Sequence, residues 1–246
     1  MQVLILAAGY GTRLYPLIKD TPKALLAVNN RPLVDYILDK FEYLPEISQV
    51  LLVTNNKFKK NFDNWAQDHK DFPVKIKIIN DGTNSPDDRL GSMGDINYVI
   101  THEKINEDLL VVGSDNLFDA KLDDFIRFSK KNAPFTTIGL YDIGSKENAK
   151  IYGVVELAAE QKILSFEEKP AQPKSSLIGM CLYFYPRPSL NFVGRFLTET
   201  QKADKAGDYI QWLYKKEPVY GFKFQGKWYD IGSVESYQDA AEHFSG

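Results

Sequence analysis

The chain has few of the residues that build disulfides or structural zinc sites. It contains one cysteine, Cys181, and three histidines among 246 residues. One cysteine excludes an intrachain disulfide, and a structural zinc site takes four Cys or His ligands. Because Cys181 lies in the apolar run LIGMCLYFY, we expect a buried, unreactive thiol rather than a nucleophile.

The sequence also lacks a long apolar segment and an excess of positive charge. The N-terminal run VLILAA is too short to span a bilayer, and no basic segment precedes it. The formal net charge is -3, so no overall positive field attracts nucleic acid. We therefore expect no membrane or nucleic-acid partner and, by default, a cytoplasmic location. Anionic ligands have to be bound by a few local cations and backbone amides.

Apolar patterning predicts an α/β fold with a doubly wound sheet. Continuous apolar runs at 3–8, 51–54 and 109–112 are typical of central parallel strands. Helical spacing alternates with them along the first half. The predicted helices there are 34–44, 57–69 and 122–130, and a further strand covers 74–79.

The second half of the sequence predicts strands with fewer helices between them. The expected strands are 135–141, 151–157, 162–167, 178–185 and 219–224. The expected helices are 189–199, 208–215 and 233–243, with Ser189 and Ser233 as N-cap residues. No linker, low-complexity tract or repeat interrupts the chain, so one domain is the simplest organisation.

A glycine loop follows the first predicted strand in LAAGYGTRLYPLIKDTPKALL. Gly9 and Gly11 permit positive φ and close approach of a ligand to the backbone, although a tight turn explains them equally well. The loop lacks the GK[ST] of a Walker A motif, and Leu14 replaces the third glycine of a dinucleotide fingerprint. Arg13 and Lys23 supply two cations, which suit a triphosphate better than a nicotinamide dinucleotide.

A carboxylate and a polar loop stand at the ends of later strands. Asp115, in VVGSDNLF, comes directly after a buried run, where ligands bind in open α/β sheets. Carboxylates there are natural Mg²⁺ ligands, although an isolated Asp at a strand end is more often a turn residue. The loop from Asn80 to Arg89 is rich in turn formers and is of the kind that is often functional.

The glycine-loop segment resembles the sugar nucleotidyltransferase signature LAAGxGTRLxPLTxxxPKALLPV, with Ile18 and Ala27 as departures. The resemblance continues through LGSMGDI, VVGSDNLF, YGVVE, FEEKP and GKWYDIGSVESYQDA, with Asp95 and Ser114 as further departures. It implies a Rossmann-like, mixed, mainly parallel sheet flanked by helices. It also implies one domain over residues 1–246, with a nucleotide-binding half at about 1–133 and a sugar-binding half at about 134–246.

The resemblance also implies a reaction and its residues. A nucleoside triphosphate and a sugar 1-phosphate would give a nucleotide sugar and pyrophosphate, with Mg²⁺ as cofactor. The implied catalytic residues are Arg13, Lys23 and Lys169, and the implied metal ligands are Asp115 and Asp230. The implied nucleotide contacts are Leu6, Ala8, Gly9, Gly11, Thr12, Asn80, Gly91 and Asp115. The implied sugar contacts are Gly153, Glu168, Lys169 and Gly179.

The base, the sugar and the oligomeric state stay open at this point. We expect dTTP or UTP with glucose 1-phosphate, because GTRLYPL and EEKP resemble the segments of thymidylyl- and uridylyltransferases. Asn80 could pair with a pyrimidine imide. Asp81 could instead accept from guanine, so a guanylyl- or cytidylyltransferase acting on mannose 1-phosphate or another acceptor is the alternative. A catalytically weak relative that binds sugar nucleotides is a further one. Because the chain ends soon after WYDIG, we expect a transferase without a β-helical extension.

Overall fold

The computed structural model describes residues 1–15, 20–200 and 204–244, with the backbone alone at Arg13. The chain forms two compact units. Unit 1 comprises Met1–Gly91, Val112–Lys121 and Gly226–Gly246, and unit 2 comprises Ser92–Val111 and Leu122–Gln225. The units interleave along the chain, whereas the expected halves follow one another at about residue 133. A single domain over the whole chain stays a prediction.

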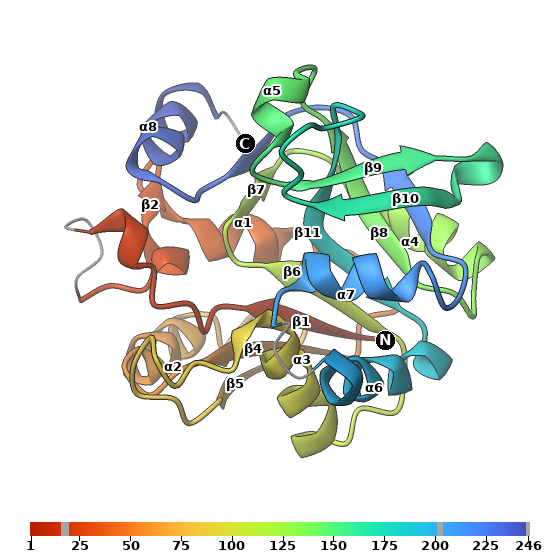
Figure 1. Ribbon diagram of the computed structural model, residues 1–246. Coiled ribbons are helices and arrows are strands. Elements are labelled where there is room, and N and C mark those ends of the chain that lie inside the picture. Colours follow the sequence, from red (N-terminus) through yellow and green to blue (C-terminus); the bar gives the residue numbers. More distant parts are fainter. Residues whose placement is uncertain (16–19, 201–203, 245–246) are drawn as a thin grey trace. The chain divides into compact units, whose positions relative to one another are not determined.

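Unit 1 contains the predicted parallel strands. β1 (Gln2–Leu6), β4 (Gln49–Thr54) and β5 (Ile76–Asn80) pair in parallel in the order β1-β4-β5 (Figure 1). The Ser114 N–H, directly after β6 (Leu109–Gly113), donates to the Leu6 carbonyl at 3.1 Å. The carboxyl ends of β1 and β6 therefore lie side by side, which is where the sequence placed the glycine loop and Asp115.

Two helices of unit 1 follow predicted apolar patterns. α2 (Lys59–Asp68) buries Phe62 and Trp65. α1 (Leu33–Asp39) ends five residues before the predicted boundary at 44. The apolar spacing continues, but the Lys40 and Phe41 N–H groups bond to carbonyls three residues back, so the chain tightens into turns.

Short ribbons and a C-terminal helix complete unit 1. β2 (Ala27–Val28) pairs with β3 (Arg31–Pro32), and β7 (Asn116–Phe118) pairs antiparallel with β13 (Trp228–Asp230). Helix α8 (Val234–His243) begins with Ser233 as N-cap in a capping box with Ser236. The predicted N-cap role of Ser233 is confirmed. Two 3₁₀ turns follow the glycine loop along the chain, η1 (Thr12–Leu14) and η2 (Lys23–Leu25).

Unit 2 contains a mixed sheet in the order β10-β9-β11-β8-β12, in which only β8 and β12 are parallel. The strands are β8 (Thr137–Asp142), β9 (Gly153–Leu157), β10 (Ile163–Glu168), β11 (Leu177–Tyr185) and β12 (Tyr220–Lys223). All five match strands predicted from the sequence. Cys181 on β11 is half-buried, so the expectation of a fully buried thiol is wrong.

Three helices of unit 2 begin and end within two residues of their predicted bounds, which are 122–130, 189–199 and 208–215. The helices of this unit are α3 (Gly91–His102, whose first residue belongs to unit 1), α4 (Asp123–Lys131), α5 (Lys146–Ala149), α6 (Asn191–Thr200) and α7 (Ala206–Leu213). Ser189 is not an N-cap, because it closes the 3₁₀ turn η4 (Arg187–Ser189) and donates its hydroxyl to the Pro186 carbonyl. Within the described ranges, no helix has the length and apolarity needed to cross a bilayer.

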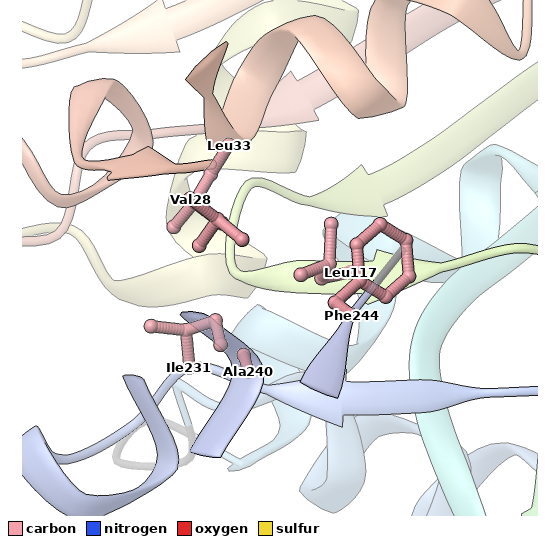
Figure 2. Packing of buried hydrophobic residues seen from close by; sticks show 6 residues of the cluster. All are labelled: Val28, Leu33, Leu117, Ile231, Ala240 and Phe244. Carbon is pink, nitrogen blue, oxygen red and sulfur yellow. The ribbon is translucent and has the colours of Figure 1, made fainter. Parts of the chain in front are cut away.

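A small hydrophobic cluster fastens α8 and β13 to the rest of unit 1 (Figure 2). Its buried residues are Val28, Leu33, Leu117, Ile231, Ala240 and Phe244. The Phe244 ring packs edge-on against Tyr36 and Tyr229, with centroid distances of 5.4 and 6.1 Å. Aromatic pairs of this geometry add to the free energy gained by burial. The last described residue of the chain is therefore a core residue of unit 1.

We expect Phe244→Ala to lower the free energy of unfolding by about 3 kcal/mol, because it leaves a cavity at a buried aromatic site. Urea unfolding followed by circular dichroism measures this loss. Phe244→Leu keeps most of the volume and should cost less than about 1.5 kcal/mol. Equal and small losses in both variants would contradict the packing role of Phe244.

Candidate functional site

The glycine loop after β1 is fixed from one side by Asn55. This buried side chain, directly after β4, donates from Nδ2 to the Ala8 carbonyl at 2.8 Å and accepts the Phe58 N–H at Oδ1. Gly11 has φ 62°, a left-handed conformation that favours glycine, whereas Gly9 does not have positive φ. A side chain at Gly9 would meet nothing within 4 Å, so its backbone faces open space.

A second network ties the glycine loop to the loop after β5. Thr83 donates its hydroxyl to Asp81 Oδ1 at 2.8 Å, and Tyr10 Oη lies 3.1 Å from Thr83 Oγ1. Since the Thr83 proton is used, Tyr10 is the donor in this second bond. Asn80 donates to Asn56 Oδ1 and accepts the Gly82 N–H. Each end of the Asn80 amide has one hydrogen-bonding position left for a ligand.

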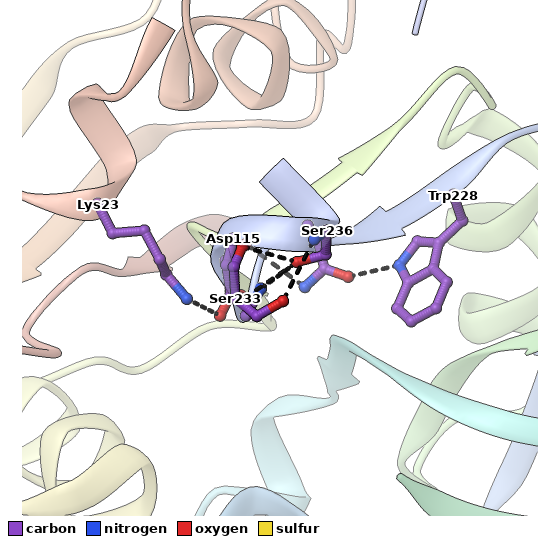
Figure 3. A network of polar contacts seen from close by, with 8 residues as sticks. Lys23, Asp115, Trp228, Ser233 and Ser236 are labelled. Carbon is purple, nitrogen blue, oxygen red and sulfur yellow. Dashed lines mark hydrogen bonds and ion pairs between the residues drawn. The ribbon is translucent and has the colours of Figure 1, made fainter. Parts of the chain in front are cut away.

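Lys23 and Asp115 meet in an ion pair of 2.6 Å between Nζ and Oδ2 (Figure 3). Both side chains keep some solvent access, at 20% and 29%. The Lys23 backbone is anchored in η2, where its carbonyl accepts the Leu26 N–H. The Asp115 carbonyl accepts the Ile231 N–H at 3.0 Å. Two residues that the sequence placed far apart are thus joined in unit 1.

The β7–β13 ribbon brings the backbone of Asp230, the second proposed metal ligand, next to that of Asp115. Asp230 pairs in register with Asn116, the residue that follows Asp115. Trp228 Nε1 donates to Asn116 Oδ1 at 2.7 Å and fixes this buried amide (Figure 3). Directly after Asp230, the Gly232 N–H donates to Ser236 Oγ of the α8 capping box. Both flanks of Asp230 are thereby fixed.

The donors around Asp115 and Asp230 fit Mg²⁺ bound together with a substrate phosphate. No group of three or more Cys, His, Asp or Glu side chains in the described part of the chain could hold a metal by itself. Mg²⁺ usually keeps waters and takes one or two carboxylates plus phosphate oxygens, whereas an all-protein zinc cage needs more ligands. Two neighbouring carboxylates therefore match the Mg²⁺ chemistry.

In unit 2, one aromatic ring lies against two of the predicted sugar-site glycines and accounts for one of them, Gly153. A Cβ on Gly153 would collide with the Phe166 ring, and a Cβ on Gly179 would stand 3.4 Å from the same ring. Phe166 is buried, so the ring cannot move away cheaply. Glycine is required at Gly153 for this packing, on the surface that carries Glu168, its cross-strand partner.

Glu168 lies in a crowded, partly buried environment built by α7. Its N–H donates to Gln211 Oε1 at 2.9 Å, and a Cβ on Gly207 would collide with its carboxylate. Burial raises the pKa of the Glu168 carboxyl, an effect that the charge of Lys169 opposes. Lys169 is exposed and has φ 48°, a left-handed conformation uncommon outside glycine. Such backbone strain gathers at functional sites.

The remaining predicted residues are placed as follows. Leu6 and Ala8 offer their carbonyls to Ser114 and Asn55, and Gly91 is left-handed at the start of α3. Thr12 is exposed at the start of η1. The side chain of Arg13 lies outside the described residues. The sequence analysis missed Asn55 and Gln211. The position of a polar residue directly after the LLVT strand could have indicated Asn55, whereas no sequence signal indicated Gln211.

We expect Glu168→Gln to raise the free energy of unfolding at pH 7, because the folded protein holds the Glu168 proton more tightly than the unfolded chain. Because the pKa of Glu168 is raised in the folded protein, this carboxyl contributes fully to stability below the ordinary glutamate pKa of about 4.3. Its contribution is lost as the pH rises through the folded-state pKa. The gain should therefore vanish at acid pH. Urea unfolding at both pH values measures it, with Glu160→Gln, at an exposed position of unit 2, as control. An equal gain at both pH values would contradict the assignment.

The comparisons with known proteins cover almost the whole chain. The family model described as nucleotidyl transferase matches residues 2–245. The bifunctional protein GlmU of Methanocaldococcus jannaschii is 28% identical over 234 residues, 94% of this chain and 51% of that protein. The glucose-1-phosphate thymidylyltransferase of Neisseria meningitidis is 29% identical over 248 residues, 98% of this chain and 81% of that protein. The chain thus spans about half the length of the GlmU relative.

Solved structures confirm the predicted fold class. A Bacillus anthracis protein in complex with a sucrose has a TM-score of 0.85 at 22% identity, covering 100% of this chain and 97% of that chain. A UDP-glucose pyrophosphorylase complexed with UDP-glucose has a TM-score of 0.80 at 23% identity, covering 98% and 97%. The Rossmann-like, mixed, mainly parallel sheet flanked by helices is confirmed. Since the family model matches nearly every residue, the chain belongs to the nucleotidyl transferase family.

Proposed function

We propose that this protein is a sugar-1-phosphate nucleotidylyltransferase that uses Mg²⁺. A sugar-phosphate oxygen attacks the α-phosphorus of a nucleoside triphosphate, and the bond to the β-phosphate breaks as pyrophosphate leaves. The observation that carries the proposal is the group Lys23, Asp115 and Asp230 at the carboxyl end of a parallel sheet, in a chain of this family. The GlmU and thymidylyltransferase relatives support the same class.

The nucleophile needs no general base at neutral pH. A phosphate monoester has a second pKa of about 6, so the attacking oxygen is already ionised. The three histidines lie outside the motifs that supply the site. Positioning and charge neutralisation then carry the reaction. Mg²⁺ bound by Asp115 and Asp230 would neutralise charge on the α-phosphate.

Unit 1 supplies the groups proposed for the triphosphate. Gly9, where a Cβ would meet nothing within 4 Å, and the left-handed Gly11 are proposed to offer their backbone amides to phosphate oxygens, and Asn55 holds the loop at Ala8. Lys23 contributes a cation at the carboxylate pair, and Arg13 is proposed for the leaving pyrophosphate. Asn80 and Asp81, on the loop that Tyr10 and Thr83 anchor, are the candidates for reading the base.

Unit 2 supplies the groups proposed for the sugar phosphate. Glu168 can accept hydrogen bonds from sugar hydroxyls, and Lys169 carries the charge for the phosphate. The Gln211 side chain orients Glu168 through its backbone. Gly153 and Gly179 are proposed to line the sugar side because their missing side chains shape this surface around Phe166.

For the substrates we propose dTTP or UTP with glucose 1-phosphate. The named relatives and structures include a glucose-1-phosphate thymidylyltransferase and a UDP-glucose pyrophosphorylase, which supports a pyrimidine base. The second candidate is a guanylyltransferase, which the buried Asp81 favours because a carboxylate accepts from guanine donors. Four nucleoside triphosphates against a panel of sugar phosphates, read by pyrophosphate release, test the whole proposal.

We expect that screen to show a preference of on the order of a hundredfold or more for dTTP or UTP over GTP and CTP, because a mismatched base leaves two hydrogen bonds of about 1–3 kcal/mol each unmade. Asn80→Ala should reduce this preference more than it reduces total turnover. GTP or CTP as the best substrate, or equal use of all four, would overturn the assignment of dTTP or UTP.

We expect Asp115→Asn and Asp230→Asn each to lower kcat by on the order of a hundredfold or more, because each removes a charge from the metal site. Pyrophosphate release at saturating Mg²⁺ measures the loss, and circular dichroism checks the fold. Asp71→Asn, an exposed carboxylate of unit 1, is the matched control. Near-normal activity in either site variant would remove that residue from the metal assignment.

We expect Arg13→Ala and Lys169→Ala to impair different substrates. Loss of a charged hydrogen bond costs about 1.5–3 kcal/mol, so each variant should raise one KM by on the order of tenfold or more. Arg13→Ala should act on the nucleoside triphosphate and Lys169→Ala on the sugar phosphate. Steady-state kinetics with each substrate varied in turn measures both, and equal changes in both KM values would contradict this division.

A further inference from the structure

The carboxylate proposed for the metal already has a cationic partner in the protein itself. Lys23 Nζ lies 2.6 Å from Asp115 Oδ2, and no resident metal is needed for this contact. The pair joins residues 92 positions apart in sequence. Figure 3 shows the Lys23 side chain reaching across to Asp115 from a separate segment of unit 1.

Both backbones are fixed, whereas both side chains have room to rearrange. The η2 turn is closed by the Leu25 N–H on Pro22 and the Leu26 N–H on Lys23, at 2.9 and 3.0 Å. Asp115 is bound through its carbonyl by Ile231. The side chains are 20% and 29% exposed, so water can replace either partner without a buried charge being stranded. The pair can therefore open without unfolding its surroundings.

We infer that Lys23 is the exchangeable counter-ion of Asp115: it neutralises the carboxylate in the metal-free protein and releases it when a divalent cation binds. This inference rests on the proposed function for the identity of the metal ligand. A single carboxylate oxygen at hydrogen-bond distance from an ammonium is a poor ligand for a cation, because the two positive charges repel. The released ammonium is then available to the triphosphate.

The exchange and a fixed, structural ion pair predict opposite changes in cation affinity when the Lys23 charge is removed. If metal binding has to break the pair, removing the Lys23 charge raises the affinity of the nucleotide-free protein for a divalent cation. If the pair instead orients Asp115 for the metal, the same change lowers the affinity. By reciprocity, a ligand that draws Lys23 away from Asp115 strengthens cation binding by the factor by which the cation strengthens binding of that ligand.

The test measures Mn²⁺ binding to the nucleotide-free full chain, from the electron paramagnetic resonance signal of free Mn²⁺. Lys23→Met removes the charge and keeps the length, and Lys23→Gln is measured beside it. We expect both to bind Mn²⁺ about tenfold more tightly than the unmodified protein, within the usual range of coupling between sites. Lys23→Arg keeps the charge and should stay within about twofold of the unmodified protein.

The controls separate this effect from a general change in charge. Lys59→Met removes another ammonium of unit 1, one that pairs with Asp63 at 2.6 Å on α2, and should leave Mn²⁺ affinity unchanged. Adding Asp115→Asn to Lys23→Met should abolish the gain. Circular dichroism and thermal unfolding confirm that each variant is folded.

Unchanged or weaker Mn²⁺ binding in both Lys23→Met and Lys23→Gln would overturn the exchange. So would a gain that survives Asp115→Asn, because it would not come from this carboxylate. The proposed function is tested separately, by pyrophosphate release from the unmodified protein. Absence of turnover with a tenfold gain in Lys23→Met would refute the activity alone, whereas turnover without that gain would refute the exchange alone.

Discussion

Pairing of β7 with β13 positions the two residues of unit 1 that are proposed as metal ligands. Three residues on each strand, more than a hundred positions apart, set Asp115 beside Asp230. A ribbon this short is marginal in water, so it depends on the hydrophobic cluster beneath it and on the capped helix α8 that follows. The Trp228–Asn116 hydrogen bond adds a fixed side-chain contact across the ribbon. Packing of the C-terminal segment is thus the condition for bringing the backbone of Asp230 next to that of Asp115.

The chain has a net charge of -3, whereas its proposed ligands are polyanions. Positive charge therefore has to be supplied locally, by individual side chains at the proposed site. The carboxylates needed for a metal repel phosphates as long as no cation neutralises them. In the protein itself, the Lys23 ammonium neutralises the Asp115 carboxylate. A phosphate can attract the same ammonium. The same two residues can therefore serve the metal-free protein and the proposed substrate complex in different pairings.

In unit 2, a polar surface that carries Glu168 and Lys169 lies over the buried Phe166 ring. Phe166 occupies the space that a Cβ at Gly153 would take, and α7 presents Gly207 and Gln211 to Glu168. Burial of Glu168 raises its pKa and disfavours the charged form, while Lys169 adopts a strained left-handed backbone. Perturbed pKa values and strain of this kind concentrate at functional sites, where stability is given up for activity.

The sequence alone determined the class of fold and the pattern of strands, because buried parallel strands read as continuous apolar runs such as VLILAA and LLVV. It also determined the N-cap at Ser233 and, through its motifs, the residues proposed for the site. Local spacing did not reveal where α1 ends or that Ser189 closes a turn, since apolar periodicity continues past a helix end. Only the tertiary structure decided that Lys23 meets Asp115, that Asn55 fixes the glycine loop and that Gln211 holds Glu168. These contacts join residues distant in sequence, and they form only when strands and helices have packed, because side-chain hydrogen bonds and ion pairs depend on distances that no local pattern encodes.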